Sequence, residues 1–318
     1  MRLVGDNEAL RRLFQNQAAV TRGEALPHRI LLVCAGGGMS CIRVPAYLSE
    51  WQEAGLVTAV DHIITVSGSG GGVGAFLSGL PHRAIQVFEA LAVTGFVSTG
   101  NYLAPSLRLS QLAKALRGEH SPIAFDQSRI TASRTSWHVV ATRITGTGTL
   151  IDAKTAAPDA VQAVLASSAF PGLTEPVPLL MDDRHEHWID GCCTMPLPIS
   201  TGIKQFRPDT VIVLESCPPA TLQPWLERCV SQCLFSLMNR RLPEPIRRGL
   251  ASMDRLVALE AYGLSRRKRI RWCRITPTRE SVPVGPLTSD IAALRRAAIE
   301  ARRFMSVQLQ QAAPARQI

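Results

Sequence analysis

The sequence predicts an α/β fold in which a mainly parallel central sheet is flanked by helices. Unbroken apolar runs of strand length occupy residues 29–34, 62–66 and 210–214, and strands that are buried on both faces have this pattern. A glycine-rich turn and a helical segment follow each of the first two runs. This strand, turn and helix order is typical of a sheet that is covered by helices on both sides.

The remaining elements are expected from local periodicity. Residues 43–52 predict a helix because Val44, Tyr47 and Trp51 recur on one face. The compact apolar segment 72–80 fits a buried helix despite its glycines. Further strands are expected at residues 137–144 and 269–275, and further helices at 159–168, 222–240, 247–262 and 290–305.

Composition indicates a folded, core-forming protein. Of its 318 residues, 46% are hydrophobic and 19% are charged, which excludes a disordered or collagen-like chain. Aromatic residues make up only 5%, so stacking platforms for single-stranded nucleic acid are not expected. We expect one α/β domain over residues 29–318, with a basic helical C-terminal third, and a helical extension over residues 1–28.

The chain lacks the signals of export and of membrane insertion. No run of about 18 uncharged apolar residues occurs, and the first residues contain no hydrophobic signal region. We therefore expect a cytoplasmic protein. The eight cysteines include no CxxC pair and are expected to be reduced, so a metal site is not predicted.

The net charge of +10 is concentrated near the C-terminus. Residues 240–274 contain eleven basic residues against three acidic ones. Such a surface attracts anionic lipid headgroups, so peripheral association with a membrane is an expectation, while nucleic acid is not an expected partner because no recognised motif is present. The basic residues are Arg240, Arg241, Arg247, Arg248, Arg255, Arg266, Arg267, Lys268, Arg269, Arg271 and Arg274.

Two glycine-rich turns are candidates for an active site. Gly36, Gly37 and Gly38 follow the first strand, and backbone without Cβ atoms lets amide groups converge on an oxyanion. The segment SGSGG at residues 67–71 follows the second strand. It nearly matches G-x-S-x-G around Ser69, the pattern of a nucleophilic serine at a sharp strand-to-helix turn.

Two further segments complete a recognisable order. DAVQAVLASSAFPG at residues 159–172 ends in proline and glycine, and WIDGCCTMPLP at 188–198 carries an Asp-Gly pair. Together with LLVCAGGG and ITVSGSGGGVGAF, these segments resemble the patatin-like phospholipase family over roughly residues 29–215. The resemblance implies a three-layer fold and a cofactor-free acyl hydrolase that cleaves lipid esters through a Ser–Asp dyad.

Carried over by position, the resemblance implies Ser69 as nucleophile, Asp190 as base and the three-glycine run as oxyanion hole. Ser69 is preferred because Gly71 and the small and apolar residues after it then match the family's helix. Gly68 and Gly70 would support the elbow on either side of that serine. Ser67 is an alternative nucleophile, since related cytosolic phospholipases have a serine followed by a glycine and a second serine. A third register places Gly70 at the nucleophile position and implies an inactive protein.

One departure from the family pattern bears on activity. The family's glycine run is usually followed by a basic residue and another glycine, whereas Met39, Ser40 and Cys41 stand here and Arg43 comes two residues too late. Three hypotheses therefore remain: a lipid acyl hydrolase, an acyltransferase or biosynthetic thioesterase or cyclase on the same dyad, and a catalytically degenerate binding protein. A Ser-His-Asp triad through His187 is the weaker catalytic alternative. We also expect residues 84–120 to form a mobile wall of the site.

Overall fold

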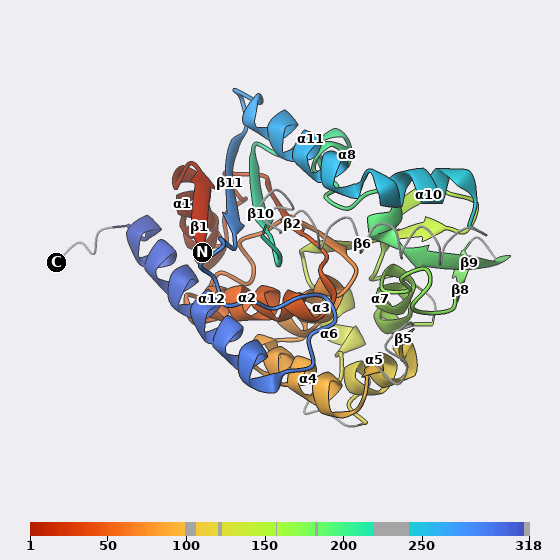
Figure 1. Cartoon of the computed structure of the whole chain (residues 1–318). Coiled ribbons are helices and arrows are strands. Elements are labelled where there is room, and N and C mark those ends of the chain that lie inside the picture. Colours follow the sequence, from red (N-terminus) through yellow and green to blue (C-terminus); the bar gives the residue numbers. More distant parts are fainter. Residues whose placement is uncertain (99–105, 120–122, 157, 182–183, 219–241, 315–318) are drawn as a thin grey trace.

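The computed structural model describes residues 1–98, 106–119, 123–156, 158–181, 184–218 and 242–314 (Figure 1). It confirms the predicted mixed α/β architecture with a mostly parallel central sheet. In the described residues the sheet has nine strands, and a short hairpin lies apart from it. The sheet strands are β1 (Arg2–Gly5), β2 (Ile30–Cys34), β3 (His62–Val66), β6 (Ser136–Arg143), β7 (Gly148–Asp152), β8 (Val177–Met181), β9 (Arg184–Asp190), β10 (Thr210–Leu214) and β11 (Arg271–Thr276).

The centre of the sheet is parallel. Strands β11, β10, β2, β3 and β6 lie side by side in that order and run in the same direction. Strands β2, β3 and β10 are almost completely buried, which explains their unbroken apolar sequences. The carboxyl ends of these strands meet at one edge, where open α/β sheets bind their ligands.

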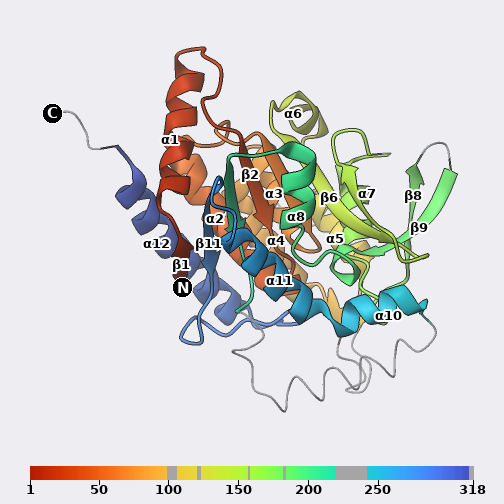
Figure 2. The same cartoon turned by 90° about the horizontal axis from the view of Figure 1, so that it is seen from above.

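Antiparallel strands form both edges of the sheet, at the two ends visible in Figure 2. At one end β1 pairs with β11, and at the other β9 pairs with β6 and forms a hairpin with β8. The predicted helical extension over residues 1–28 therefore begins instead with an edge strand. The helix that follows contributes Leu10 and Leu13 to the main core, so both elements are part of the same packed structure.

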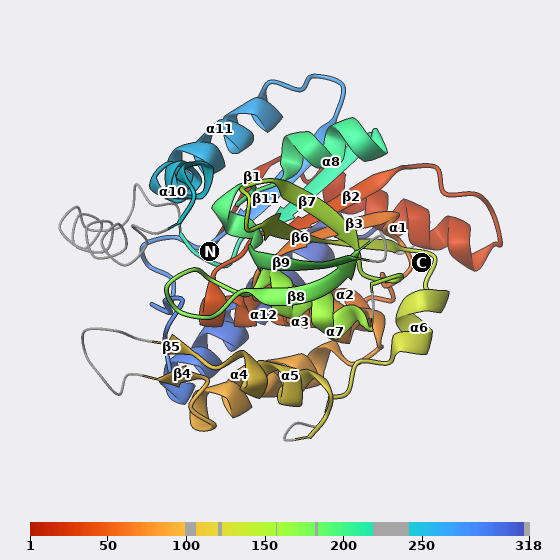
Figure 3. The ribbon, with the colours of Figure 1, turned by 90° about the vertical axis from the view of Figure 1, so that its right-hand side faces the viewer.

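Helices cover both faces of the sheet (Figure 3). Helices α2, α3, α4, α7 and α12 lie on one face, and α8, α10 and α11 on the other. The helices are α1 (Glu8–Thr21), α2 (Arg43–Glu53), α3 (Ser69–Leu77), α4 (Pro81–Val93), α5 (Leu109–Leu116), α6 (Gln127–Ala132), α7 (Ala160–Ser167), α8 (Ile199–Phe206), α10 (Glu244–Ala251), α11 (Met253–Ser265) and α12 (Ile291–Ala312). The shorter elements are β4 (Val97–Ser98), β5 (Ser106–Leu107) and the 3₁₀ turns η1 (Gly38–Ile42) and η2 (Gly191–Cys193).

The helix expected at residues 247–262 is divided into α10 and α11, because the chain turns at Ser252 between them. The helix expected at 222–240 lies outside the described residues. In the part of the chain that is described, none of the helices has both the length and the apolar character needed to span a bilayer.

Candidate active site

Ser67 lies at the turn between β3 and α3, directly after the last residue of the strand. Its φ of 57° is in the left-handed region, which L-residues rarely adopt. A serine held in this conformation at the N-terminus of a helix is the geometry of a nucleophile elbow. The turn fixes it further, because the backbone NH of Ser67 donates to Ser167 Oγ at 2.8 Å.

Asp190 is the partner of Ser67. The Ser67 hydroxyl donates to Asp190 Oδ2 at 2.6 Å, and both side chains are buried. The sheet register brings them together: Val66 pairs with Val140, and the next residue of β6, Ala141, pairs with Asp190. Strand β7 pairs along one side of β6, so β3 and β9 pair with its other side, end to end, and Ser67 and Asp190 lie next to each other there.

The Asp190 carboxylate is held in place by its neighbours. Oδ1 accepts a hydrogen bond from the Cys192 amide at 2.9 Å, and the Asp190 amide donates to Ala169 O at 2.9 Å. Only glycine fits after it, since a Cβ at Gly191 would collide with the Val140 carbonyl. Burial raises the pKa of Asp190 from 3.8 to about 6, although the hydrogen bonds from Ser67 and Cys192 oppose this effect. Such a carboxylate is a better base than an exposed one.

Ser69, the nucleophile preferred on sequence grounds, does not contact Asp190. Its side chain is completely buried at the first turn of α3. The Ser69 hydroxyl lies within hydrogen-bond distance of the carbonyls of Cys34 (3.0 Å) and Val66 (2.8 Å). These contacts link the end of β2 to the end of β3, which is a structural use of the Ser69 hydroxyl. The predicted Ser69–Asp190 pair is therefore corrected to Ser67–Asp190, the alternative register.

The three-glycine run lies beside Ser67. A Cβ at Gly36 would be 3.1 Å from Ser67 Cβ, and a Cβ at Gly68 would be 2.8 Å from Gly38 O. Gly37 and Gly38 have φ of 154° and 55°. Within the described residues, their amides and that of Gly68 donate no hydrogen bond to another backbone group. These amides are thus not used in backbone pairing, and Gly38 and Gly68 line the same pocket as Ser67.

The other predicted support glycines differ in how tightly they are packed. A Cβ at Gly70 would approach Val164 Cγ2 of α7 to 2.9 Å, which is closer than real Cβ contacts. At Gly71 the nearest atom would be Leu116 Cδ2 at 3.6 Å, an ordinary contact. Gly70 is therefore required for the packing of α3 on α7, whereas Gly71 borders the pocket described below.

The unusual segment after the glycines is well ordered by its contacts. Ser40 Oγ donates to Gly37 O at 2.7 Å, and the Met39 amide donates to Pro286 O at 2.9 Å. Arg43 is 1% exposed and donates to the backbone carbonyls of Ser216 and Val282. Its charge is therefore used to hold neighbouring loops together and is not directed at Ser67.

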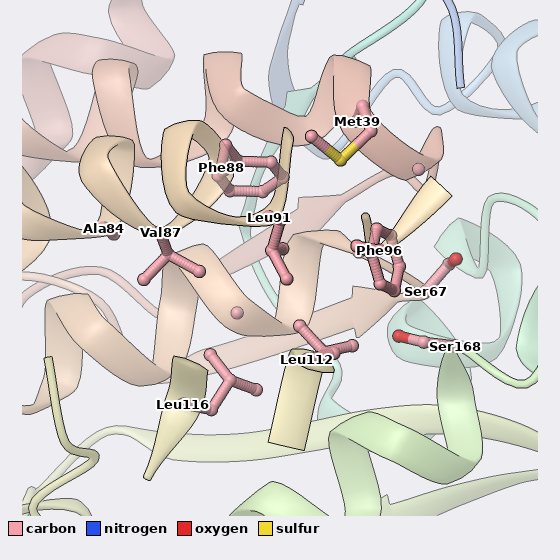
Figure 4. Close-up of a pocket in the computed structure, with 13 residues that line it drawn as sticks. Met39, Ser67, Ala84, Val87, Phe88, Leu91, Phe96, Leu112, Leu116 and Ser168 are labelled. Atoms are coloured by element: carbon pink, nitrogen blue, oxygen red, sulfur yellow. The ribbon is translucent and has the colours of Figure 1, made fainter. Parts of the chain in front are cut away.

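An apolar pocket opens beside the serine (Figure 4). Ser67, Ser168 and the backbone of Gly38 and Gly68 are its polar components. Most of the remaining wall comes from residues 84–120, the segment expected to form a mobile wall of the site. Part of that segment, residues 99–105 and 120, lies outside the described residues. The apolar lining residues are Met39, Ala84, Val87, Phe88, Leu91, Phe96, Leu112 and Leu116.

Two histidines considered from the sequence, His62 and His187, lie away from this arrangement. His62 is at the opposite end of β3, where its Nδ1 contacts Ser136 Oγ at 2.6 Å and its ring stacks on Phe206. His187, expected in a loop, is in β9 and pairs with Pro178 of β8. Neither contacts Ser67. Among the described residues, no three His, Cys, Asp or Glu side chains form a metal-binding cluster.

Comparisons with known proteins add little. No family model and no curated protein matches the sequence. Among solved structures, the chain is similar to the crystal structure of VipD from Legionella pneumophila, with 13% identity and a TM-score of 0.44. The match covers 90% of this chain and 68% of VipD. A likeness this distant carries no argument about function. The function can therefore be inferred only from the geometry of the site.

Proposed function

We propose that this chain is a serine acyl hydrolase of the patatin-like phospholipase class, with Ser67 as nucleophile and Asp190 as base. The observation that carries this proposal is the 2.6 Å hydrogen bond from the Ser67 hydroxyl to a buried carboxylate, at an elbow that opens into an apolar pocket. The same contact argues against a degenerate binding protein, because a scaffold that has lost catalysis has no need of a strained serine paired with a carboxylate.

The reaction follows from this contact. Ser67 Oγ attacks the carbonyl carbon of an ester while its proton passes to Asp190. Asp190 then delivers the proton to the leaving alcohol oxygen as the ester C–O bond breaks, leaving an acyl-Ser67. The amides of Gly37, Gly38 and Gly68 are proposed to stabilise the oxyanion, and removing a donor of this kind typically costs about 10²–10³ in rate.

The pocket supports a fatty acyl chain as the substrate group. The described residues of its apolar wall include no charged side chain, so the pocket favours a hydrocarbon chain over a polar one. Its polar groups lie at the end that contains Ser67, where an ester carbonyl would be placed. Carboxylic esters of long-chain fatty acids fit this combination.

Narrowing the end of the pocket that lies away from Ser67 tests whether the pocket holds the acyl chain. Val87 lies on the side away from Ser67 in Figure 4 and is 3% exposed. Val87→Phe is expected to lower kcat/KM for long-chain p-nitrophenyl esters by about tenfold or more relative to the acetyl ester, because the added ring occupies the space of the chain. The measurement is kcat/KM across a series of acyl lengths.

Val93 provides a matched control for this variant. It belongs to the same helix, α4, and is 67% exposed. Val93→Phe should leave the chain-length profile unchanged. A profile that is equally unchanged in folded Val87→Phe would contradict the placement of the acyl chain.

We also propose that the basic face formed by α10, α11 and the turn after α11 contacts anionic membrane. Six of its exposed basic residues form no ion pair within the described part of the chain: Arg247, Arg255, Arg266, Arg267, Lys268 and Arg269. Leu259 and Tyr262, at 53% and 61% exposed, supply apolar side chains beside them. Arg274 is excluded from this face because it pairs with Glu215 at 2.6 Å, and Arg240 and Arg241 lie outside the described residues.

Reversing two charges on this face is expected to weaken vesicle binding. Each basic residue near an anionic surface contributes about 1 kcal/mol, so Arg267→Glu with Lys268→Glu should reduce binding to phosphatidylserine vesicles more than tenfold. The control is Arg296→Glu with Arg303→Glu, which makes the same charge change on α12, on the other face of the sheet. Vesicle sedimentation at low and high salt measures the effect. Equal binding by both double variants, or binding insensitive to salt, would contradict the proposal.

An acyltransferase would use the same dyad and differ only in the acceptor of the acyl group. Product analysis with a competing alcohol separates the two: a hydrolase releases mainly free fatty acid, and a transferase mainly the new ester.

A further inference from the structure

Ser168 carries a buried hydroxyl in the pocket that has no part in the proposed dyad or oxyanion hole. It is 6% exposed and lines the pocket together with Ser67. Among the described residues its Oγ has no hydrogen-bond partner. Figure 4 shows the Ser168 oxygen directed into the pocket, on the same side as Ser67. A buried hydroxyl without a partner is unfavourable, so a group that enters the pocket is the natural partner.

The position of Ser168 makes its lack of a partner unusual. It caps the C-terminus of α7, where a serine hydroxyl commonly bonds to a carbonyl of the preceding turn. Ser78, at the corresponding position of α3, donates to Gly74 O at 2.8 Å, and Ser252, at the end of α10, donates to Arg248 O. Ser168 instead turns away from the helix and toward the pocket.

The neighbours of Ser168 place it on the side of the base. The preceding residue, Ser167, accepts the hydrogen bond from the Ser67 amide, and the following residue, Ala169, accepts the one from the Asp190 amide. The hydroxyl is therefore attached to the segment that holds both members of the dyad. The glycine run approaches Ser67 from a different segment, at the end of β2. The leaving alcohol and the entering water must both approach the proton carrier, Asp190.

We propose that the Ser168 hydroxyl binds the leaving-group oxygen during acylation and the water during deacylation. This inference rests on the proposed function. In the first step its O–H donates to the departing alcohol oxygen. In the second, Ser168 Oγ accepts one O–H of the water while the other proton passes to Asp190. The water oxygen bonds to the acyl carbon, the bond from that carbon to Ser67 Oγ breaks, and Asp190 returns the proton to Ser67.

The test uses p-nitrophenyl butyrate, whose leaving group departs without assistance. Ser168→Ala is expected to acylate at close to the wild-type rate but to deacylate about tenfold more slowly. Intact-mass measurement at steady state should therefore show a larger fraction of acyl-enzyme, and turnover should fall. Ser168→Thr, which keeps a hydroxyl, should restore turnover to within about threefold of wild type.

Thermal stability separates this role from a structural one. Ser168→Ala should leave Tm unchanged or raise it, because it removes an unpartnered hydroxyl. The control, Ser78→Ala, removes a bonded hydroxyl at the equivalent position, and should lower Tm without changing the acyl-enzyme fraction. A lowered Tm with unchanged deacylation in Ser168→Ala would overturn the inference. A wild-type protein that forms no acyl-enzyme and hydrolyses no ester would instead overturn the proposed function, and this inference with it.

Discussion

Replacing Ser67 with alanine is expected to reduce ester hydrolysis by at least about 10³-fold. The variant loses the nucleophile. The oxyanion amides alone then provide only the residual rate that remains when enzymes of this kind lose a catalytic residue. Because the Ser67 side chain makes one hydrogen bond within the described part of the chain, to Asp190, the fold should survive the substitution. Steady-state turnover of a medium-chain p-nitrophenyl ester measures the loss, and circular dichroism checks the fold.

Ser69→Ala is the matched control, two residues along the same turn. It removes a hydroxyl that joins Cys34 O, Val66 O and the Val66 amide, so it should lower the free energy of unfolding by about 1–3 kcal/mol. Turnover by the folded fraction should stay within about tenfold of wild type. The opposite pattern, with Ser67→Ala active and folded Ser69→Ala inactive, would restore the register first preferred on sequence grounds.

Asp190→Asn is expected to cause the second large loss of activity, because an amide cannot accept the Ser67 proton. The pH profile of the wild type follows from the raised pKa of Asp190, about 6. Below this pH the carboxyl is protonated and cannot act as a base, so kcat/KM should rise through pH 6 and reach a plateau above pH 7. A rate that is flat from pH 5 to 8 would contradict Asp190 as the base.

The same carboxyl predicts how stability depends on pH. Its pKa is higher in the folded state than the ordinary 3.8, so folding favours the protonated form. The contribution of Asp190 is present in full below pH 4 and is lost as pH rises through 6, at a cost of about 3 kcal/mol. Asp190→Asn removes this cost, so its free energy of unfolding relative to wild type should increase from pH 4 to pH 8. Urea unfolding at both pH values measures the difference, and a decrease would contradict the assignment.

The sequence carries information that favours Ser67, the proposed nucleophile, although the likeness to G-x-S-x-G favours Ser69. Glycines flank Ser69 on its C-terminal side, and this similarity to G-x-S-x-G favoured it. An elbow serine, however, must directly follow its strand, and the strand predicted at residues 62–66 ends one residue before Ser67. Ser69 is three residues beyond that end and already belongs to α3. Ser69 itself occupies a flanking position that normally holds glycine.

Other features depended on long-range pairing that one sequence does not reveal. The buried strands β2, β3 and β10 were predictable because their apolar runs are continuous. Strand β9 was not, because its first half is polar and exposed and only its end, near Trp188, is buried. Pairing with β8 and β6 makes it a strand. The pocket likewise arises from the packing of separate helices. So does the lack of a hydrogen-bond partner for the Ser168 hydroxyl among the described residues.

The most direct test of the central claim is to identify the residue that a fluorophosphonate modifies in the wild-type protein. After labelling, proteolysis and fragmentation of the peptide that contains residues 67–69 distinguish the two serines, since Gly68 separates them. The Ser67–Asp190 dyad predicts a single adduct on Ser67, with labelling strongly slowed in Asp190→Asn. An adduct on Ser69, or no adduct on the folded wild-type protein, would contradict it.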